Sequence, residues 1–283
     1  MSVFSGKARV AQAGALSSGV AGLWVNAPEI AAVAVPGQFV MVSGGPQRIT
    51  RRPFGVAGVD RARGEVRLAL RVAGTASAWL AGRQAGEEIE LHGPLGAGFA
   101  LPEPGGEAWL AGGGIGAAPL LFLAEALRAQ GTAVWSAVGG RTAADVWAAP
   151  ELGRLGGVAV TTEDGSAGEK GLVTIPLAAR LAQAAREPDR PRPAVYACGP
   201  RGMLVAVARA TLAAGLDCQV SVEERMACGV GACAGCTWPD GRLAEGLALR
   251  RVGSPPERGG EGASGHPLRV CRDGPCFWVV SAS

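Results

Sequence analysis

The chain has 283 residues, enough to bury two cores and a smaller module, and its formal net charge of +3 is spread along the sequence. The sequence has no basic stretch interleaved with aromatic residues, which disfavours nucleic-acid binding, and no unbroken apolar run that predicts a signal peptide or membrane insertion. Seven cysteines without an export signal predict a cytoplasmic protein.

Residues 1–102 carry short apolar runs separated by turn residues. The runs that we expect to form strands are Lys7–Ala13, Gly19–Asn26, Gln38–Val42 and Glu65–Val72. Glycine and proline punctuate these runs, as at Pro36-Gly37 and Arg63-Gly64. Short strands at regular spacing with this punctuation predict an antiparallel β-barrel.

Residues 103–220 alternate between strand-like and helix-like patterns. The expected strands are Trp109–Ala111, Ala133–Val138, Val158–Thr161 and Ala194–Ala197. Helices are expected after the first strand, with Leu120, Leu123 and Leu127 on one face, and around Met203–Leu212. Strands that alternate with helices predict an α/β domain with a parallel sheet.

Two glycine turns follow strands of this predicted sheet. Gly112–Ala117 fits G-x-G-x-x-A, and Cys198-Gly199-Pro200 follows a later strand. Glycine lets the backbone approach a pyrophosphate, which the N–H groups of a helix start favour. The acidic residue expected about 20 positions further on is missing, since the second strand ends in Gly139-Gly140-Arg141. The usual dinucleotide fold is therefore disfavoured, whereas another α/β nucleotide site is not.

Residues 221–283 hold the most specific pattern in the chain. Cys228, Cys233 and Cys236 have the spacing C-x4-C-x2-C, and Cys271 follows much later. This is the plant-type arrangement for a [2Fe–2S] cluster held by four thiolates. Only Gly, Ala and Val stand between the first three cysteines, so the backbone can wrap closely around an inorganic core.

Other cysteines leave alternatives open. Cys276 stands close enough to Cys271 to serve as the fourth ligand instead, and a zinc site built from cysteines is the competing interpretation of the whole set. Cys218 lies in an apolar run and is expected in the core. The stretch Asp240–His266, rich in Gly, Pro, Arg and Glu, is expected to form a mobile surface excursion.

Taken in this order, the motifs resemble the electron-transfer subunit of B-type dihydroorotate dehydrogenases, within the ferredoxin reductase superfamily. The resemblance covers nearly the whole chain outside 240–266, and the cysteine block is its most specific part. The segments that carry it are Arg51–Pro53, His92–Phe99, Gly112–Pro119, Glu163–Ser166, Lys170–Thr174, Cys198–Leu204, Glu223–Cys236 and Val270–Pro275.

The resemblance implies an FAD-binding barrel (1–102), an NAD-binding α/β domain (103–220) and a [2Fe–2S] module (221–283). The residues implied to contact FAD are Arg52, Pro53, Phe54, Gly55, Leu70, Arg71, Val72, Ala76, Ser77, Gly93 and Pro94. Those implied to contact NAD are Gly113, Gly114, Ile115, Gly116, Cys198, Gly199 and Pro200.

Two of these positions carry further expectations. Gly55 departs from the serine usual in the family, which removes a hydroxyl near the flavin. Ser77 is expected to be the N-cap of a short helix, in preference to a shifted alignment on Gly74-Thr75.

The resemblance also implies a partner, an FMN-containing catalytic subunit that oxidises dihydroorotate in pyrimidine biosynthesis, in a heterotetramer. Electrons would pass from FMN through the cluster and FAD to NAD+. No orotate-binding residues stand out, and neither histidine, His92 or His266, is assigned a catalytic role. Glu163 and Asp164 favour NAD over NADP, because carboxylates repel a 2′-phosphate, while Arg141 points the other way.

Two rival interpretations remain. In the first, the same flavin and cluster form a stand-alone NAD(P)H-dependent reductase that feeds a ferredoxin, an oxygenase or a sulfur-reducing enzyme. In the second, the cysteines hold zinc in a structural or regulatory module, which leaves the paired glycine turns unexplained.

Overall fold

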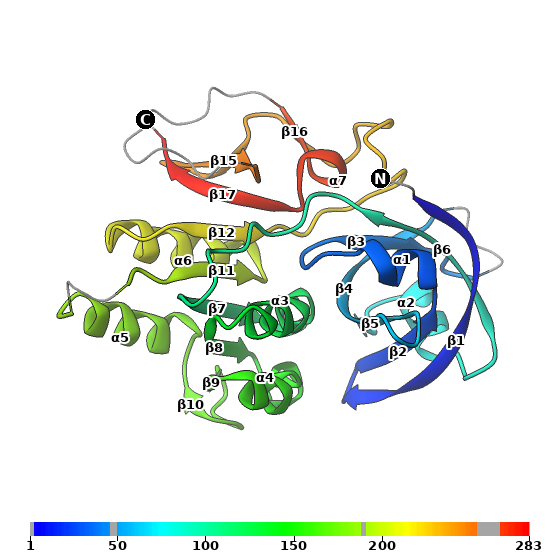
Figure 1. Ribbon diagram of the computed structural model, residues 1–283, viewed down its shortest axis with the longest axis horizontal. Coiled ribbons are helices and arrows are strands. Elements are labelled where there is room, and N and C mark those ends of the chain that lie inside the picture. Colours follow the sequence, from blue (N-terminus) through cyan, green and yellow to red (C-terminus); the bar gives the residue numbers. More distant parts are fainter. Residues whose placement is uncertain (1–2, 46–49, 188–190, 254–266, 283) are drawn as a thin grey trace.

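The computed structural model describes residues 3–45, 50–187, 191–253 and 267–282. A closed barrel and a large sheet lie side by side, and the C-terminal segment covers one end of both (Figure 1). None of the helices in these ranges is both long and apolar enough to cross a lipid bilayer.

The barrel closes in the order β1-β2-β5-β4-β3-β6, with antiparallel pairing throughout. Its strands are β1 (Phe4–Ser17), β2 (Val20–Asn26), β3 (Phe39–Val42), β4 (Arg52–Asp60), β5 (Glu65–Arg71) and β6 (Glu88–Leu95). Two short helices, α1 (Pro28–Val33) and α2 (Thr75–Ala81), connect them. Alternate residues such as Leu23, Val25, Val66 and Leu68 fill the interior, so the predicted barrel is confirmed.

Strands β4 and β6 were not among the predicted runs. Strand β4 contains Pro53 and two glycines, which depress strand propensity, and β6 alternates Glu88 and Glu90 with apolar residues. Closure of the barrel supplies the pairing that makes both segments extended.

The second body is a nine-stranded sheet in the order β10-β9-β8-β7-β11-β12-β17-β15-β14. Its parallel part comprises β7 (Glu107–Gly113), β8 (Ala133–Gly140), β9 (Gly157–Thr162), β10 (Glu169–Lys170), β11 (Ala194–Cys198) and β12 (Cys218–Ser221). Helices α3 (Ala117–Ala129) and α4 (Ala149–Leu155) lie on the side of the barrel, and α5 (Thr174–Ala184) and α6 (Arg201–Ala213) cover the other face (Figure 1). The predicted parallel α/β architecture is confirmed.

The C-terminal segment extends this same sheet. Antiparallel strands β17 (Cys276–Ser281), β15 (Leu247–Arg251) and β14 (Arg242–Ala244) follow β12 in the sheet. Strand β13 (Thr237–Trp238) pairs with β16 (Leu268–Arg269), which leads into α7 (Val270–Asp273). The expectation of a mobile excursion over 240–266 is therefore wrong for 242–251, because the pairing of β15 with β17 and of β14 with β15 overrides the polar composition. Residues 254–266, with His266, lie outside the described part.

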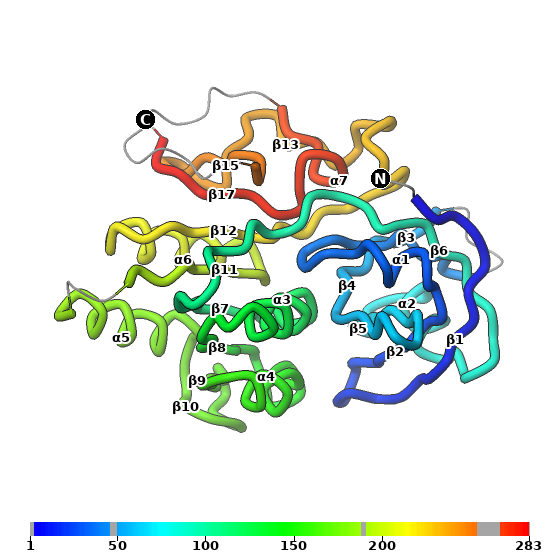
Figure 2. Tube along the Cα trace, viewed as in Figure 1, coloured from blue at the N-terminus to red at the C-terminus, as the bar shows by residue number. Residues whose placement is uncertain are grey.

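The link from β6 to β7 crosses from the barrel to the sheet beneath the C-terminal segment (Figure 2). The Ala97 N–H donates to the carbonyl of Gly274 at 2.5 Å. Further along, the Gln219 side chain and the Tyr196 hydroxyl bond the backbone of Ala100 at 2.8–2.9 Å. The link is thus tied to both β11 and β12, which fixes the barrel beside the carboxyl ends of the parallel strands.

Candidate functional site

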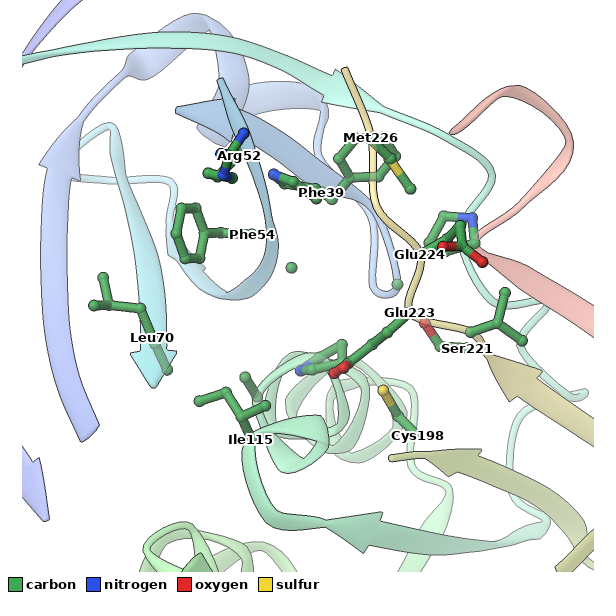
Figure 3. A pocket seen from close by; sticks show the side chains of 18 of the residues that line it. Phe39, Arg52, Phe54, Leu70, Ile115, Cys198, Ser221, Glu223, Glu224 and Met226 are labelled. Carbon is green, nitrogen blue, oxygen red and sulfur yellow. The ribbon is translucent and has the colours of Figure 1, made fainter. Parts of the chain in front are cut away.

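A cavity of about 550 Å³ lies where the barrel, the α/β sheet and the C-terminal segment meet (Figure 3). Arg52, Phe54 and Leu70 line it from the barrel, and Ile115 and Cys198 from the α/β part. The segment 221–226, which leads towards the first cysteine of the C-terminal pattern, closes the third side. A mostly apolar hollow of this size suits a planar aromatic ligand.

The cavity continues along the barrel into a hollow of about 390 Å³ lined by Arg52, Arg71 and residues 73–77. Two guanidinium groups in one hollow suit an anionic, phosphate-bearing ligand. A Cβ atom added at Gly55 would lie 3.7 Å from Pro119, an ordinary contact, so the serine usual in the resembling family would fit there.

Ser77 lies at this hollow but is not a helix N-cap. Helix α2 begins at Thr75 after the N-cap Gly74, and the Ser77 hydroxyl accepts the N–H groups of Ala73 and Gly74 at 2.9 and 3.0 Å. The prediction of a Ser77 N-cap is therefore wrong by three positions, since Gly74 adopts the extended backbone that a cap requires.

A second cavity, of about 580 Å³, lies at the carboxyl ends of β7, β8 and β11. Gly113, Gly114 and Pro200 line it from the two predicted glycine turns. Ligands collect at this edge of open α/β sheets. Arg71, Ile115 and Glu223 line both cavities, which therefore adjoin.

Glu223 occupies the junction of the two cavities. Its side chain is exposed where it faces them and extends towards Ile115, in the turn just before α3 (Figure 3). Desolvation raises the pKa of the Glu223 carboxyl, and the charge of Arg71 partly offsets that rise.

The two glycine turns touch each other directly. A Cβ atom at Gly116 would lie 2.4 Å from the carbonyl oxygen of Cys198, and one at Gly199 would lie 3.0 Å from Gly113 Cα. Gly199 also has a φ of 159°, at the limit of the region where side chains are strained. Gly116 and Gly199 thus allow close packing of the turns, and Gly113 and Gly114 form the cavity surface.

Of the two carboxylates after β9, only one lines the second cavity. Glu163 lies there together with Arg141. Asp164 is held by Ser166, whose backbone N–H and hydroxyl donate to Oδ1 at 2.9 and 2.6 Å. Of the two residues expected to repel a 2′-phosphate, only Glu163 therefore lines this cavity.

Asp145 adds a charge that sequence reasoning missed. Burial alone would raise the pKa of this carboxyl, but hydrogen bonds from Arg71 and the backbone of Thr142 and Arg141 hold it below its usual range. Arg71 belongs to barrel strand β5 and Asp145 to the short helix η2 (Ala143–Val146), so their ion pair joins the two bodies at the second cavity.

The four cysteines of the predicted motif lie in the C-terminal segment as two neighbouring pairs, Cys228 with Cys233 and Cys236 with Cys271. Cys236 and Cys271 are buried with their sulfurs 3.3 Å apart, while Cys228 is half-buried and Cys233 exposed. Each sulfur receives a backbone N–H. Cys271 accepts from Gly231 at 3.0 Å, and Cys228, Cys233 and Cys236 accept from Cys233, Gly235 and Cys271 at 3.4–3.5 Å.

N–H groups directed at sulfur stabilise thiolates. Those of Cys233, Val230 and Ala232 lower the pKa of the Cys228 thiol to about 6. Thiolate sulfurs with backbone N–H donors are the ligands that an iron–sulfur cluster uses. The four cysteines therefore fit such a group in residue type and backbone donors, while no three of these side chains form one metal-binding arrangement in the described part of the chain.

The remaining thiols lie elsewhere. Cys276 is fully buried on β17, with its sulfur 3.7 Å from the carbonyl oxygen of Gly37. Ser221 is its cross-strand neighbour and also that of Cys198, so the three side chains form a row across β11, β12 and β17. Cys218 is in the core, as expected, and burial raises its pKa to about 12.

Some predicted contacts do not line the cavities described above, namely Val72, Gly93, Pro94, Gly116 and Gly199. Sequence reasoning missed other lining residues, among them Gly37, Phe39, Pro119, Asp145, Glu223, Glu224, Arg225 and Met226. The last four begin the segment Glu223–Cys236, which contains the first three cysteines of the motif. Their place in that segment was the sequence signal that could have identified them.

Comparison with known proteins agrees with this geometry. The iron–sulfur cluster binding domain of dihydroorotate dehydrogenase B matches residues 223–247. The chain is 35% identical over 244 residues to the dihydroorotate dehydrogenase B (NAD(+)) electron transfer subunit of Caldanaerobacter subterraneus subsp. tengcongensis, covering 86% of this chain and 85% of that one. The subunit of the same name from Desulforamulus reducens is 38% identical, with coverages of 75% and 79%.

Solved structures with the same fold include the NADH-dependent reduced ferredoxin-NADP oxidoreductase, described for flavin-based electron bifurcation. Its TM-score is 0.76 at 27% identity, covering 96% of this chain and 87% of that one. The ferredoxin reductase of carbazole 1,9a-dioxygenase has a TM-score of 0.64 at 21% identity, with coverages of 76% and 67%, which shows the shared fold alone.

Proposed function

The chain belongs to the family of electron-transfer subunits of dihydroorotate dehydrogenase B, and from that membership we propose that it carries electrons between NAD and an FMN-containing catalytic subunit that oxidises dihydroorotate. When bound, FAD and a [2Fe–2S] cluster supply the exchange between a two-electron hydride and single electrons. No catalytic side chain is assigned, because the protein contributes binding, orientation and electrostatics.

The observation that carries the proposal is the order of three sites along the molecule. The flavin-sized cavity shares Ile115 and Glu223 with the second cavity, and its wall 221–226 runs directly into Cys228. A ligand in the first cavity would therefore stand between a dinucleotide and the cysteine loop. That order suits a carrier that connects hydride chemistry to one-electron transfer.

The barrel residues would hold FAD. Phe54 and Leu70 offer apolar contact to a ring system, and Arg52 and Arg71 offer positive charge to the pyrophosphate in the adjoining hollow. Ala76 and Ser77 line the same hollow. At Gly55 the chain has only a backbone N–H to offer a flavin where the family has a hydroxyl.

The α/β part would hold NAD at Gly113, Gly114, Ile115 and Pro200, with Glu163 excluding a 2′-phosphate. Gly116 and Gly199 would act indirectly, by letting the two turns pack together. The cluster would be held by Cys228, Cys233, Cys236 and Cys271. The N–H group directed at each sulfur supports this set, and the enclosure of Cys276 on β17 supports Cys271 as the fourth ligand.

The boundaries 1–102, 103–220 and 221–283 remain part of the proposal, with the qualification that β14, β15 and β17 continue the central sheet. A heterotetramer with the FMN subunit is proposed from family membership. Thiolate ligands require a reducing compartment, which supports a cytoplasmic location.

The test is a spectrum of anaerobically purified protein with flavin, iron and sulfide quantified, combined with purification alone and with a dihydroorotate dehydrogenase catalytic subunit. We expect bound FAD, a [2Fe–2S] EPR signal after reduction with NADH, and a stable complex that couples dihydroorotate oxidation to NAD+ reduction. A colourless or zinc-only protein would overturn the proposal. A flavin and cluster without any complex would favour the stand-alone reductase instead.

A further inference from the structure

Trp238 lies where three parts of the molecule meet. It follows Cys236 by two residues and is only 9% exposed. Its indole Nε1–H donates to Glu224 Oε2 at 2.9 Å. The guanidinium of Arg201 lies over the indole ring, with its central carbon 4.8 Å from the ring centroid. The side chain is therefore held by a carboxylate at its polar edge and by a cation at its face.

Glu224 belongs to the wall of the first cavity. The segment 222–226 lines that cavity and reaches Cys228 two residues later. The other carboxylate oxygen of Glu224 accepts the N–H of Arg225 at 2.8 Å, so both oxygens are engaged. Strand β12 ends at Ser221, and the Val222 N–H still donates to the carbonyl of Pro275 at 2.9 Å. Residues 223–226 continue no strand within the described part of the chain, so their position depends on side-chain contacts.

Arg201 stands between two residues that line the second cavity but does not line it itself. It opens helix α6 between Pro200 and Gly202, which both line that cavity. Its side chain points the other way, and Nε donates to the carbonyl of Leu243 at 2.9 Å. Arg201 is thereby fixed against strand β14 as it stacks on Trp238.

We propose that Trp238 is a positioning residue that fixes the segment 222–228, and with it the cysteine loop, relative to both cavities. It does so by joining Glu224 of the first cavity to Arg201 of the helix that borders the second. The contact itself is independent of what the cavities bind; only its consequence, a constant spacing between flavin and cluster, rests on the proposed function.

The test uses hydrogen–deuterium exchange of the purified holoprotein. Trp238→Phe keeps an aromatic ring under Arg201 but removes the N–H that Glu224 accepts. Because a hydrogen bond to a charged group contributes enough to change a local opening equilibrium about tenfold, we expect exchange at 222–228 to rise about tenfold. Exchange in the barrel strands should stay unchanged.

A matched control is Trp278→Phe. Trp278 lies on β17, and its buried Nε1–H has no partner among the described residues, so this variant removes an indole N–H without removing a bond. Exchange at 222–228 should stay at the wild-type rate in Trp278→Phe. An equal rise in both variants, or no rise in Trp238→Phe, would overturn the proposal.

A second pair of variants keeps the test valid where Trp238→Phe does not fold. Glu224→Gln keeps one oxygen that can accept the indole N–H and loses the acceptor of the exposed Arg225 N–H, which water can replace, whereas Glu224→Leu loses both acceptors. Exchange near the wild-type rate in Glu224→Gln, with a rise in Glu224→Leu, supports the positioning role, and identical behaviour refutes it. The EPR g values should change in Glu224→Leu and not in Glu224→Gln. Absence of any iron signal would reject the proposed function while leaving the exchange result intact.

Discussion

Arg67 of barrel strand β5 and Glu151 of helix α4 form a two-point ion pair, with Nη1–Oε2 and Nη2–Oε1 distances of 2.5 and 2.8 Å. The Arg67 side chain is only 11% exposed. A planar guanidinium matches a carboxylate in this way and fixes orientation as well as distance. This pair joins the barrel to the α/β part, as does the Arg71–Asp145 pair at the second cavity.

Glu151→Gln should destabilise the protein in a pH-dependent way. The hydrogen bonds from Arg67 lower the pKa of Glu151, so the stabilisation is present above the unfolded-state pKa of about 4.3 and is lost as the pH falls through the lower folded-state value. We expect a loss of about 1–2 kcal/mol at pH 7 that shrinks below about pH 4.3. Thermal unfolding at several pH values measures it.

The control for this prediction is Glu88→Gln. Glu88 pairs with Lys7 at 3.3 Å on the surface, where its side chain is 51% exposed, so water and salt screen the pair. Its loss should leave the unfolding temperature nearly unchanged. Equal effects of the two variants would contradict the assigned role of the Arg67–Glu151 pair.

Gly116→Ala should damage the dinucleotide site. The new methyl group would lie 2.4 Å from the Cys198 carbonyl oxygen, a backbone atom that cannot rotate away, so the two glycine turns must separate. We expect NADH affinity to fall by roughly tenfold or more, measured by titration. Gly14→Ala on β1, where nothing lies within 4 Å of the added methyl, should bind NADH normally.

Cys271→Ser should abolish the cluster, and Cys276→Ser should leave it in place. The Cys271 sulfur lies beside that of Cys236, whereas Cys276 is enclosed on β17 against Gly37. Iron analysis should therefore find almost no iron in Cys271→Ser, with bound FAD retained because the flavin residues lie on the barrel. Loss of iron in Cys276→Ser with retention in Cys271→Ser would reverse the assignment.

Glu163→Gln should weaken the preference for NAD over NADP. Removing the carboxylate leaves Arg141 as the nearby charge in the same cavity, which favours a 2′-phosphate. We expect kcat/KM with NADPH to rise by about tenfold (~1.4 kcal/mol) relative to NADH. Asp164→Asn should not change the ratio, since Ser166 already engages that carboxylate. A larger effect of Asp164→Asn than of Glu163→Gln would show that Asp164, and not Glu163, discriminates against NADPH.

The local sequence patterns were sufficient to predict the architecture and to identify the candidate cysteine ligands. Short runs with glycine and proline predicted the barrel, alternation predicted the parallel sheet, and the spacing of Cys228, Cys233 and Cys236 predicted the cluster loop. These features depend on neighbours within one element, so a single sequence contains them. The N-cap at Gly74 was missed because Ser77 offers the more typical capping side chain.

Contacts between distant segments were decided only by the tertiary structure. The packing of β15 against β17 turned part of an expected excursion into sheet, and the burial of Cys276 separated it from Cys271. Glu223 and Asp145 became cavity residues because the barrel docks at the carboxyl ends of the parallel strands. Residue type and spacing determine which elements form and which chemistry they carry. Which side chains share a cavity follows from how those elements pack, and packing depends on shapes that no local pattern encodes.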